Sequence, residues 1–293
     1  MSNWIPSLRA NRWRLLVVAG LIGLVGCSAG PPQDLRGPAR QKGQAFRSEM
    51  KLVMTKGKLV MGAGIQREEG TCDMTLTVVE DDEILEVQGR QVTKQQTTVI
   101  TDDRSMRVDG EKVPGPERGD LLVGEKILRE RKEGKWKNTL VGKQPTTEQQ
   151  KELYALGPLE NTDDLYPEGK VKPGHTWKVD PAHLRKLLGP GFTEVSGEAS
   201  MTFERTTTLD GESCALINLS MNIKGKMPDE DNNEVNIELT VKGPEYRSLR
   251  SGYNIKSSLS GTMKLTGTIV EGGQRIKMEM SGPVTVETIT KLK

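Results

Sequence analysis

Alternation of apolar and polar residues is the feature that most restricts how this chain can fold. In the cleanest stretch, residues 235–241, Val, Ile, Leu and Val alternate with Asn, Glu and Thr. Successive side chains of a strand point to opposite faces, so this pattern predicts a strand with one buried and one solvated face. The same period recurs over residues 201–208, 217–223, 257–270, 275–280 and 284–290.

Short turn signals separate these predicted strands. Asp210-Gly211, residues 228–233 and residues 271–273 supply the residue types that hairpin connections need. The alternation is weaker earlier in the chain, where turns are expected at Asp109-Gly110 and at the acidic run of residues 80–83. The sequence therefore predicts an N-terminal β half over residues 45–142 and a C-terminal β half, an antiparallel meander, over residues 193–293.

A helical connection, residues 143–192, is expected between the halves. Residues 145–147, Pro-Thr-Thr, precede a predicted helix over residues 148–156, with Gln149 and Gln150 placed to close a capping box and Gly157-Pro158 placed to end the helix. Asp180 and Pro181 signal the start of a second short helix. The predicted fold class is mainly β: a large antiparallel curved sheet, half-barrel or sandwich-like, in two strand-rich halves with two short helices between them.

The N-terminus has the layout of a signal peptide. Arg9, Arg12 and Arg14 precede an apolar run that ends at Cys27. That run is about a dozen residues long, whereas a membrane-spanning helix needs roughly 20. We therefore expect residues 1–26 to be a signal peptide rather than a permanent membrane span.

Residues 24–27, Leu-Val-Gly-Cys, resemble a bacterial lipobox, which implies cleavage before Cys27 and lipidation of its thiol. A chance cysteine after an ordinary signal peptide is the alternative. The protein is thus expected in the cell envelope, facing the periplasm or the exterior. Ser28 stands where an aspartate would indicate retention in the inner membrane, so the outer membrane is favoured. The Gly- and Pro-containing segment that follows predicts a flexible tether, and residues 27–44 form this expected anchor and tether.

Charge and composition limit the classes of partner. Without the three arginines of the signal peptide, 39 Lys and Arg residues face 40 Asp and Glu residues. Nucleic-acid binders need a strongly basic surface, so nucleic acid is not expected as a partner. Aromatic residues make up only 4% of the chain, and the core must therefore come from Leu, Val, Ile and Met.

Residues 165–177, with the sequence LYPEGKVKPGHTW, resemble an element in a family of uncharacterised bacterial lipoproteins. The resemblance implies a lipobox, a tether and two strand-rich halves, and it carries no known activity. The residues of this element also have a structural explanation. Pro173-Gly174 predicts a turn, and Trp177 begins a strand in which its indole can seal the edge of the core. Ligand contact is the alternative role for Trp177.

Chemical motifs are sparse. The sequence has no dinucleotide, phosphate-loop or zinc-protease signature, and His175 and His183 are its only histidines. No cofactor, metal site or catalytic residue is therefore predicted. Residues 229–233 partly imitate a calcium loop, but the glycine and the bidentate glutamate of such loops are missing, so a solvated hairpin loop is favoured. Cys72 and Cys214 either pair as a disulfide, which an oxidising compartment permits, or remain two separately buried thiols.

The expected function is that of a non-catalytic envelope lipoprotein that binds an apolar ligand or a protein partner. Its expected partners are the membrane, through the lipid anchor, and a lipid or an envelope protein. A structural or surface-assembly lipoprotein is the alternative, followed by an envelope hydrolase with an unrecognised site. A cavity lined by Met and Leu would favour lipid binding, whereas a filled core would favour a structural or partner-binding role.

Overall fold

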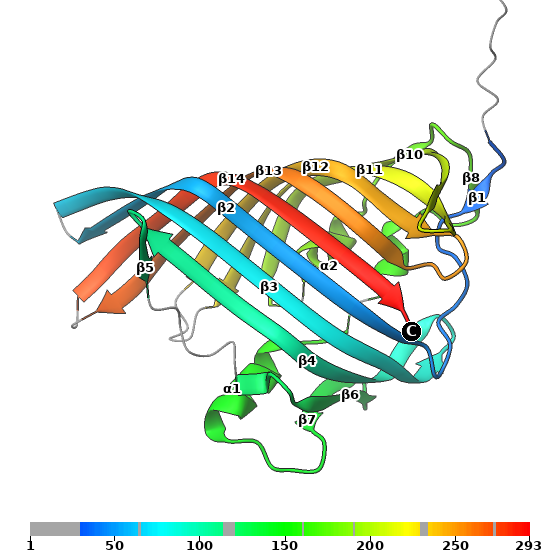
Figure 1. Ribbon diagram of the computed structural model, residues 1–293, viewed down its shortest axis with the longest axis horizontal. Coiled ribbons are helices and arrows are strands. Elements are labelled where there is room, and N and C mark those ends of the chain that lie inside the picture. The colour runs from blue at the N-terminus through cyan, green and yellow to red at the C-terminus, as the bar shows by residue number, and fades with distance from the viewer. Residues whose placement is uncertain are drawn as a thin grey trace, which may run out of the picture.

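One antiparallel sheet of twelve strands dominates the structure, a computed structural model that describes residues 30–63, 66–113, 121–159, 161–189, 191–228, 234–271 and 274–293. The predicted signal peptide, Cys27 and the acidic loop 229–233 lie outside the described residues. The strands follow the order β7-β6-β4-β3-β2-β14-β13-β12-β11-β10-β9, and β5 pairs with β4. Because β2 lies beside β14, the two predicted halves are parts of one sheet rather than the layers of a sandwich (Figure 1).

The central strands are long, and all of them are joined in antiparallel register. The strands of the first half are β2 (Ala45–Ala63), β3 (Gln66–Gln88), β4 (Gln91–Val108), β5 (Glu111–Val113), β6 (Lys126–Lys132) and β7 (Lys135–Leu140). The strands of the second half are β9 (Thr176–Lys178), β10 (Glu194–Leu209), β11 (Glu212–Pro228), β12 (Glu234–Ser248), β13 (Asn254–Glu271) and β14 (Gln274–Leu292). A separate pair joins β1 (Gln33–Asp34) to β8 (Lys170–Val171).

The sheet arches over the connection between its halves (Figure 1). A bulge lies near its middle, in β2 after Met54, where β2 has one residue more than each of its neighbours, β3 and β14. A Cβ on Gly282 would lie 2.7 Å from the Gly57 Cα, so the two backbones approach closely only because neither residue has a side chain. Bulges kink a strand and increase its twist, which accounts for curvature at this position.

Methionine is confined to one face of this sheet, which we call the inner face. All eleven methionines other than Met1 lie on it, as the strand registers show. One continuous cross-strand row contains Met106, Met74, Met54, Val284, Gly261, Val241, Met221 and Ala199. The predicted aliphatic core is confirmed, because the main cluster of buried residues consists mostly of Leu, Ile, Val and Met from this face.

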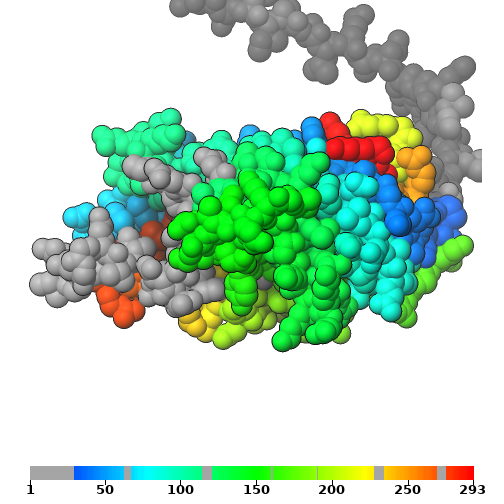
Figure 2. Space-filling model, turned by 90° about the horizontal axis from the view of Figure 1, so that it is seen from below, coloured from blue at the N-terminus to red at the C-terminus, as the bar shows by residue number. Residues whose placement is uncertain are grey.

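The connection covers part of the inner face. It contains α1 (Thr147–Ala155), the short 3₁₀ helices η2 (Thr162–Leu165) and η3 (Pro181–His183), and α2 (Arg185–Leu188). The predicted capping box is confirmed, and Thr146 and Gln149 form it; the N-cap at Asp180 is confirmed as well. Seen from below, β6, β7 and α1 project from the middle of the molecule in green (Figure 2). They enclose a small second core of Val99, Leu122, Ile127, Leu140 and Leu153.

The predicted flexible tether is corrected from Gln33 onward, where the segment is packed into the fold. Leu35 is only 1% exposed and belongs to the main core. Arg36 donates to the carbonyl oxygen of Tyr166, and Arg40 donates to those of Ser251 and Gly252. Glycine and proline suggested a mobile segment, but one leucine and two arginines hold it against residues more than 120 positions away.

The predicted turn at residues 80–83 is also corrected. These residues continue β3 without a break, and a register shift follows Val79. Glu80 and Asp82 face inward, while Asp81, on the outer face, forms an ion pair with Arg47 at 2.7 Å. A run of charged residues predicts a turn because strands rarely bury such residues, and buried partners on a neighbouring strand make the exception possible here.

Candidate functional site

A cavity of about 490 Å³ lies between the inner face and the connection. Strands β2, β3, β4 and β14 form one side, and Leu159, Asn161 and Thr162 of the connection contribute to the other. Charged residues at its lining are Arg40, Arg90 and Arg129, together with Glu49, Glu80 and Asp82. The cavity is therefore ionic at this end of the sheet, although apolar residues such as Phe46, Met50, Ile84 and Tyr253 also line it.

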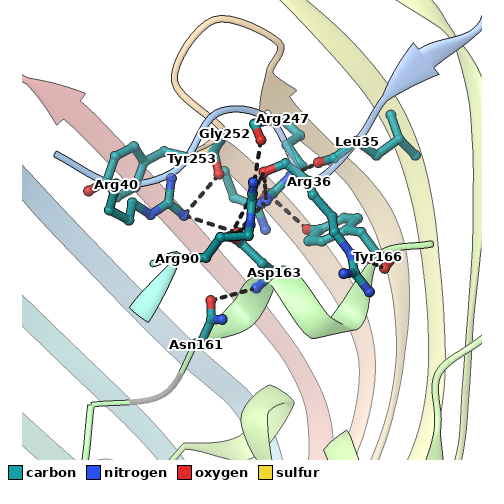
Figure 3. Close-up of polar contacts among 12 residues, drawn as sticks. Leu35, Arg36, Arg40, Arg90, Asn161, Asp163, Tyr166, Arg247, Gly252 and Tyr253 are labelled. Carbon is teal, nitrogen blue, oxygen red and sulfur yellow. Dashed lines mark hydrogen bonds and ion pairs between the residues drawn. The ribbon is translucent and has the colours of Figure 1, made fainter. Parts of the chain in front are cut away.

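Asp163 is the centre of a buried ionic cluster beside the cavity (Figure 3). Its carboxylate lies 2.9 Å from the Arg90 guanidinium, 3.1 Å from that of Arg247 and 3.5 Å from that of Arg40. The side chains of Asp163 and Arg247 are each only 1% exposed. The backbone N–H of Asp163 donates to the side chain of Asn161, which caps η2 and fixes the carboxylate in place.

Aromatic rings support two of these arginines. The Arg247 guanidinium carbon lies 3.8 Å from the centre of the Tyr166 ring, and that of Arg40 lies 3.8 Å from the Tyr253 ring. Arg247 also donates to the carbonyl oxygens of Leu35 and Arg36. The cluster therefore joins the N-terminal segment, η2 and the β12–β13 corner in one network (Figure 3).

Glu245 is buried next to this cluster. Burial raises its pKa to about 7, and the nearby Arg247 opposes the shift. The hydroxyl group of Tyr166 lies 3.5 Å from the Glu245 carboxyl, and burial raises the pKa of that tyrosine as well. Glu245 therefore holds a proton far more readily than an exposed glutamate does.

Glu80, Asp82 and Arg129 form a second charged group, on the other side of the cavity. Asp82 accepts hydrogen bonds of 2.6 Å from both Gln95 and Thr97. Burial raises the pKa of Glu80 to about 7, repulsion by Asp82 adds to the shift, and attraction by Arg129 opposes it. Burial likewise raises the pKa of Asp82.

A polarity gradient runs along the inner face from the cavity. Ser48 and Glu80 are cross-strand partners at the cavity, followed by Met50 with Val78, Leu52 with Leu76, and Met54 with Met74. On the neighbouring β14 the corresponding residues are Thr290, Thr288, Val286 and Val284. Each row is about 6.6 Å from the next, so the gradient spans about 20 Å. We call the half-buried side chains of Met50, Leu52, Leu76, Val78 and Val286 the apolar strip.

Trp177 lies apart from this cavity and is half-buried against the main core. It pairs with Met201 across β9 and β10, and its indole N–H donates to the Leu165 carbonyl oxygen at 2.9 Å. Among the residues described, it does not line the cavity. These contacts agree with the predicted role in sealing the core edge.

Cys72 and Cys214 are both free and buried. Cys72 lies in β3 and Cys214 in β11, with β2, β14, β13 and β12 between them. The alternative of two separate thiols therefore describes this structure. Burial raises the pKa of each thiol, which disfavours the reactive thiolate.

Metal binding finds no ready ligand set in the described part of the chain, where no group of three or more His, Cys, Asp or Glu residues is placed to hold an ion. No helix of the described residues is both long and apolar enough to cross a membrane. What the cavity offers instead is a set of guanidinium donors, carboxyl groups and an adjoining apolar surface.

Sequence reasoning missed most of this site. Asp163, Arg247, Arg90 and Arg129 belong to no motif, and they bond partners as distant as 27 residues for Arg129, 73 for Arg90 and 212 for Arg247. The run at residues 80–83 was the one available signal, because its alternate members fall on the apolar face if the strand continues.

Comparisons with known proteins do not show a family. No family model and no curated protein matches the chain. A structure titled for lipid–protein interactions in lipovitellin is similar at a TM-score of 0.40 and 8% identity over 86% of this chain, which covers 26% of that chain. An outer membrane channel from Pseudomonas putida F1 gives a TM-score of 0.23 and 6% identity over 86% of this chain and 97% of the channel. TM-scores this low do not establish a shared fold.

Proposed function

We propose that this protein is a non-catalytic lipoprotein of the bacterial cell envelope that binds an amphiphilic ligand on the inner face of its sheet. The acyl chain lies along the apolar strip, and the polar head lies in the charged cavity. The polarity gradient of the inner face carries this proposal, because successive rows change from Ser48 and Glu80 to leucine and methionine within about 20 Å.

The physical properties of the strip fit such a ligand. Its side chains are half-buried, so an acyl chain laid on them would remove further apolar surface from water. Methionine is flexible and polarisable, and it adapts to chains of different shape. A small number of polar groups at one end of an apolar surface is the usual composition of a ligand site.

The proposed anchor explains how the protein meets such ligands. Lipidated Cys27, after removal of residues 1–26, would hold the protein at a membrane surface, with the outer membrane favoured. Multiple acyl chains give stable attachment, because each buried methylene contributes about 0.8 kcal/mol. Strand β1 begins at Gln33, six residues after this cysteine, so the anchor would keep the sheet close to the bilayer that supplies the ligand.

A matched pair of substitutions tests the site. The mature chain carrying Cys27→Ala keeps every described residue and avoids the attached lipid. Binding of a fluorescent fatty acid would be measured for Leu52→Glu, on the strip, and for Val53→Glu, the next residue on the opposite face; both positions are half-buried.

The expected result is a loss of at least about tenfold in affinity for Leu52→Glu, equivalent to about 1.4 kcal/mol, and a change within twofold for Val53→Glu. Thermal unfolding of both variants checks that they are folded. A wild-type protein that binds no fatty acid, or an equal loss in both variants, would overturn the proposal and leave the protein-partner role as the better account.

A further inference from the structure

Charged groups of both signs meet at the cavity and in the ionic cluster beside it. The guanidinium groups of Arg40, Arg90, Arg129 and Arg247 lie at the cavity or in the cluster beside it, together with the carboxyl groups of Glu80, Asp82, Asp163 and Glu245, and the exposed Glu49 also lines the cavity. Each proton taken up by a carboxyl group leaves one positive charge without a partner. An unpaired buried charge is costly, so a bound anion would be stabilised there.

Arg129 has an N–H group at the cavity that forms no hydrogen bond within the described residues. It is 8% exposed, and one terminal nitrogen donates to the carbonyl oxygens of Leu156 and Gly157 at 3.2 and 3.1 Å. Its buried Nε has no hydrogen-bond partner within the described residues. The buried hydroxyl group of Tyr253, which also lines the cavity, has none either. Buried donors are normally paired, and two orphans on one cavity indicate a missing acceptor.

The apolar strip begins at the same place. Met50 lines the cavity, and its cross-strand partner Val78 belongs to the strip. A ligand whose head accepts hydrogen bonds from Arg129 and Tyr253 would therefore have its tail directly on the apolar strip. Chain length and head charge would be recognised by adjoining groups of side chains.

We propose that the cavity binds the anionic group, a carboxylate or a phosphate, of an amphiphile, with Arg129 and Tyr253 as hydrogen-bond donors to its oxygens. This inference rests on the proposed function and specifies the head of its ligand. Charge-assisted hydrogen bonds from a guanidinium are stronger than those between neutral groups, which favours an anionic over an uncharged head.

Binding should weaken as the pH rises. Glu80 faces Asp82 on its own strand, Asp102 on β4 and Arg129 on β6, and shares the cavity with Arg40, Arg90 and Tyr253. Its raised pKa, about 7, keeps it largely protonated at pH 6 and largely ionised at pH 8. An ionised Glu80 neutralises Arg129 and repels an anion, so the preference for an anionic head is present below pH 7 and is lost above it.

Calorimetric titration of the Cys27→Ala mature chain with three probes tests this. Laurate has an anionic head, monolaurin carries the same acyl chain with an uncharged head, and acetate is a carboxylate without a chain. At pH 6 we expect laurate to bind at least about tenfold more tightly than monolaurin, and acetate to bind far more weakly than either. At pH 8 the preference for laurate should fall severalfold.

Two variants and one matched control assign the effect to the cavity. Arg129→Gln should abolish the preference for laurate and change the affinity for monolaurin less than twofold. Arg131→Gln, an exposed arginine two residues along the same strand, is the matched control and should change neither affinity. Glu80→Gln mimics the protonated acid and should show at pH 8 the preference for laurate that the wild type shows at pH 6. This variant tests the proposal even if Arg129→Gln fails to fold.

Each remaining outcome is decisive. Equal binding of laurate and monolaurin by wild type at pH 6 would overturn the anionic-head inference and leave the proposed function intact. Binding of neither lipid would overturn both. Acetate binding as tight as that of laurate would show a site for free anions, with no part for the apolar strip.

Discussion

Asp163 is the residue on which the order of the ionic cluster depends most. Its carboxylate is the anion that Arg40, Arg90 and Arg247 share, and it lies on a four-residue helical turn between the two halves. Without it, Arg247 would remain buried with carbonyl and amide partners but no carboxylate in contact. A buried charge that loses its counter-ion destabilises a protein more than a surface ion pair ever stabilises one.

We predict that Asp163→Asn lowers the free energy of unfolding by about 3–5 kcal/mol, measured by urea denaturation. The adjacent Asp164 provides the control, because its carboxylate pairs with Lys186 and its side chain is 37% exposed. Asp164→Asn should cost no more than about 1 kcal/mol. Equal losses in the two variants would show that the buried cluster contributes no special stability.

The N-terminal segment and strand β3 show, at the scale of elements, where sequence reasoning succeeded and failed. Local signals predicted the capped helix α1 and the Asp109-Gly110 turn, because the residues that fix them are neighbours in sequence. The docked segment 33–40 and the unbroken acidic strand depend on partners elsewhere in the chain, such as Asp163 and Arg129. A single sequence does not show which distant charges will become neighbours.

We predict that Leu35→Ala destabilises the protein by about 2–5 kcal/mol, the usual cost of truncating a buried leucine. Hydrogen exchange should also quicken selectively in residues 33–44, because Leu35 is the buried apolar contact of that segment. Leu292→Ala, at a position 36% exposed, should change stability by less than about 0.5 kcal/mol. A mobile tether would instead show fast exchange in the wild type and no response to Leu35→Ala.

The whole molecule separates its chemistry by face. Period-2 alternation predicted the curved antiparallel sheet and its aliphatic core, and the confinement of methionine to the inner face follows from the same parity. The cavity was not predictable in this way, because it forms where β2, β3, β4 and β14 meet the connection. A cavity lined by Met and Leu would favour lipid binding; the structure instead has a cavity of mixed lining, in which Met50 and Leu159 lie beside charged residues.

Photo-crosslinking of the mature, lipid-anchored protein in its own envelope tests the central claim most directly. A benzophenone amino acid would replace Leu76, on the apolar strip, or Thr77, the next residue on the opposite face. After illumination, mass spectrometry of the purified protein should find an acyl-chain adduct at position 76 and none at position 77. Absence of a lipid adduct at position 76, or equal labelling at both positions, would contradict the proposal that the inner face carries an amphiphile.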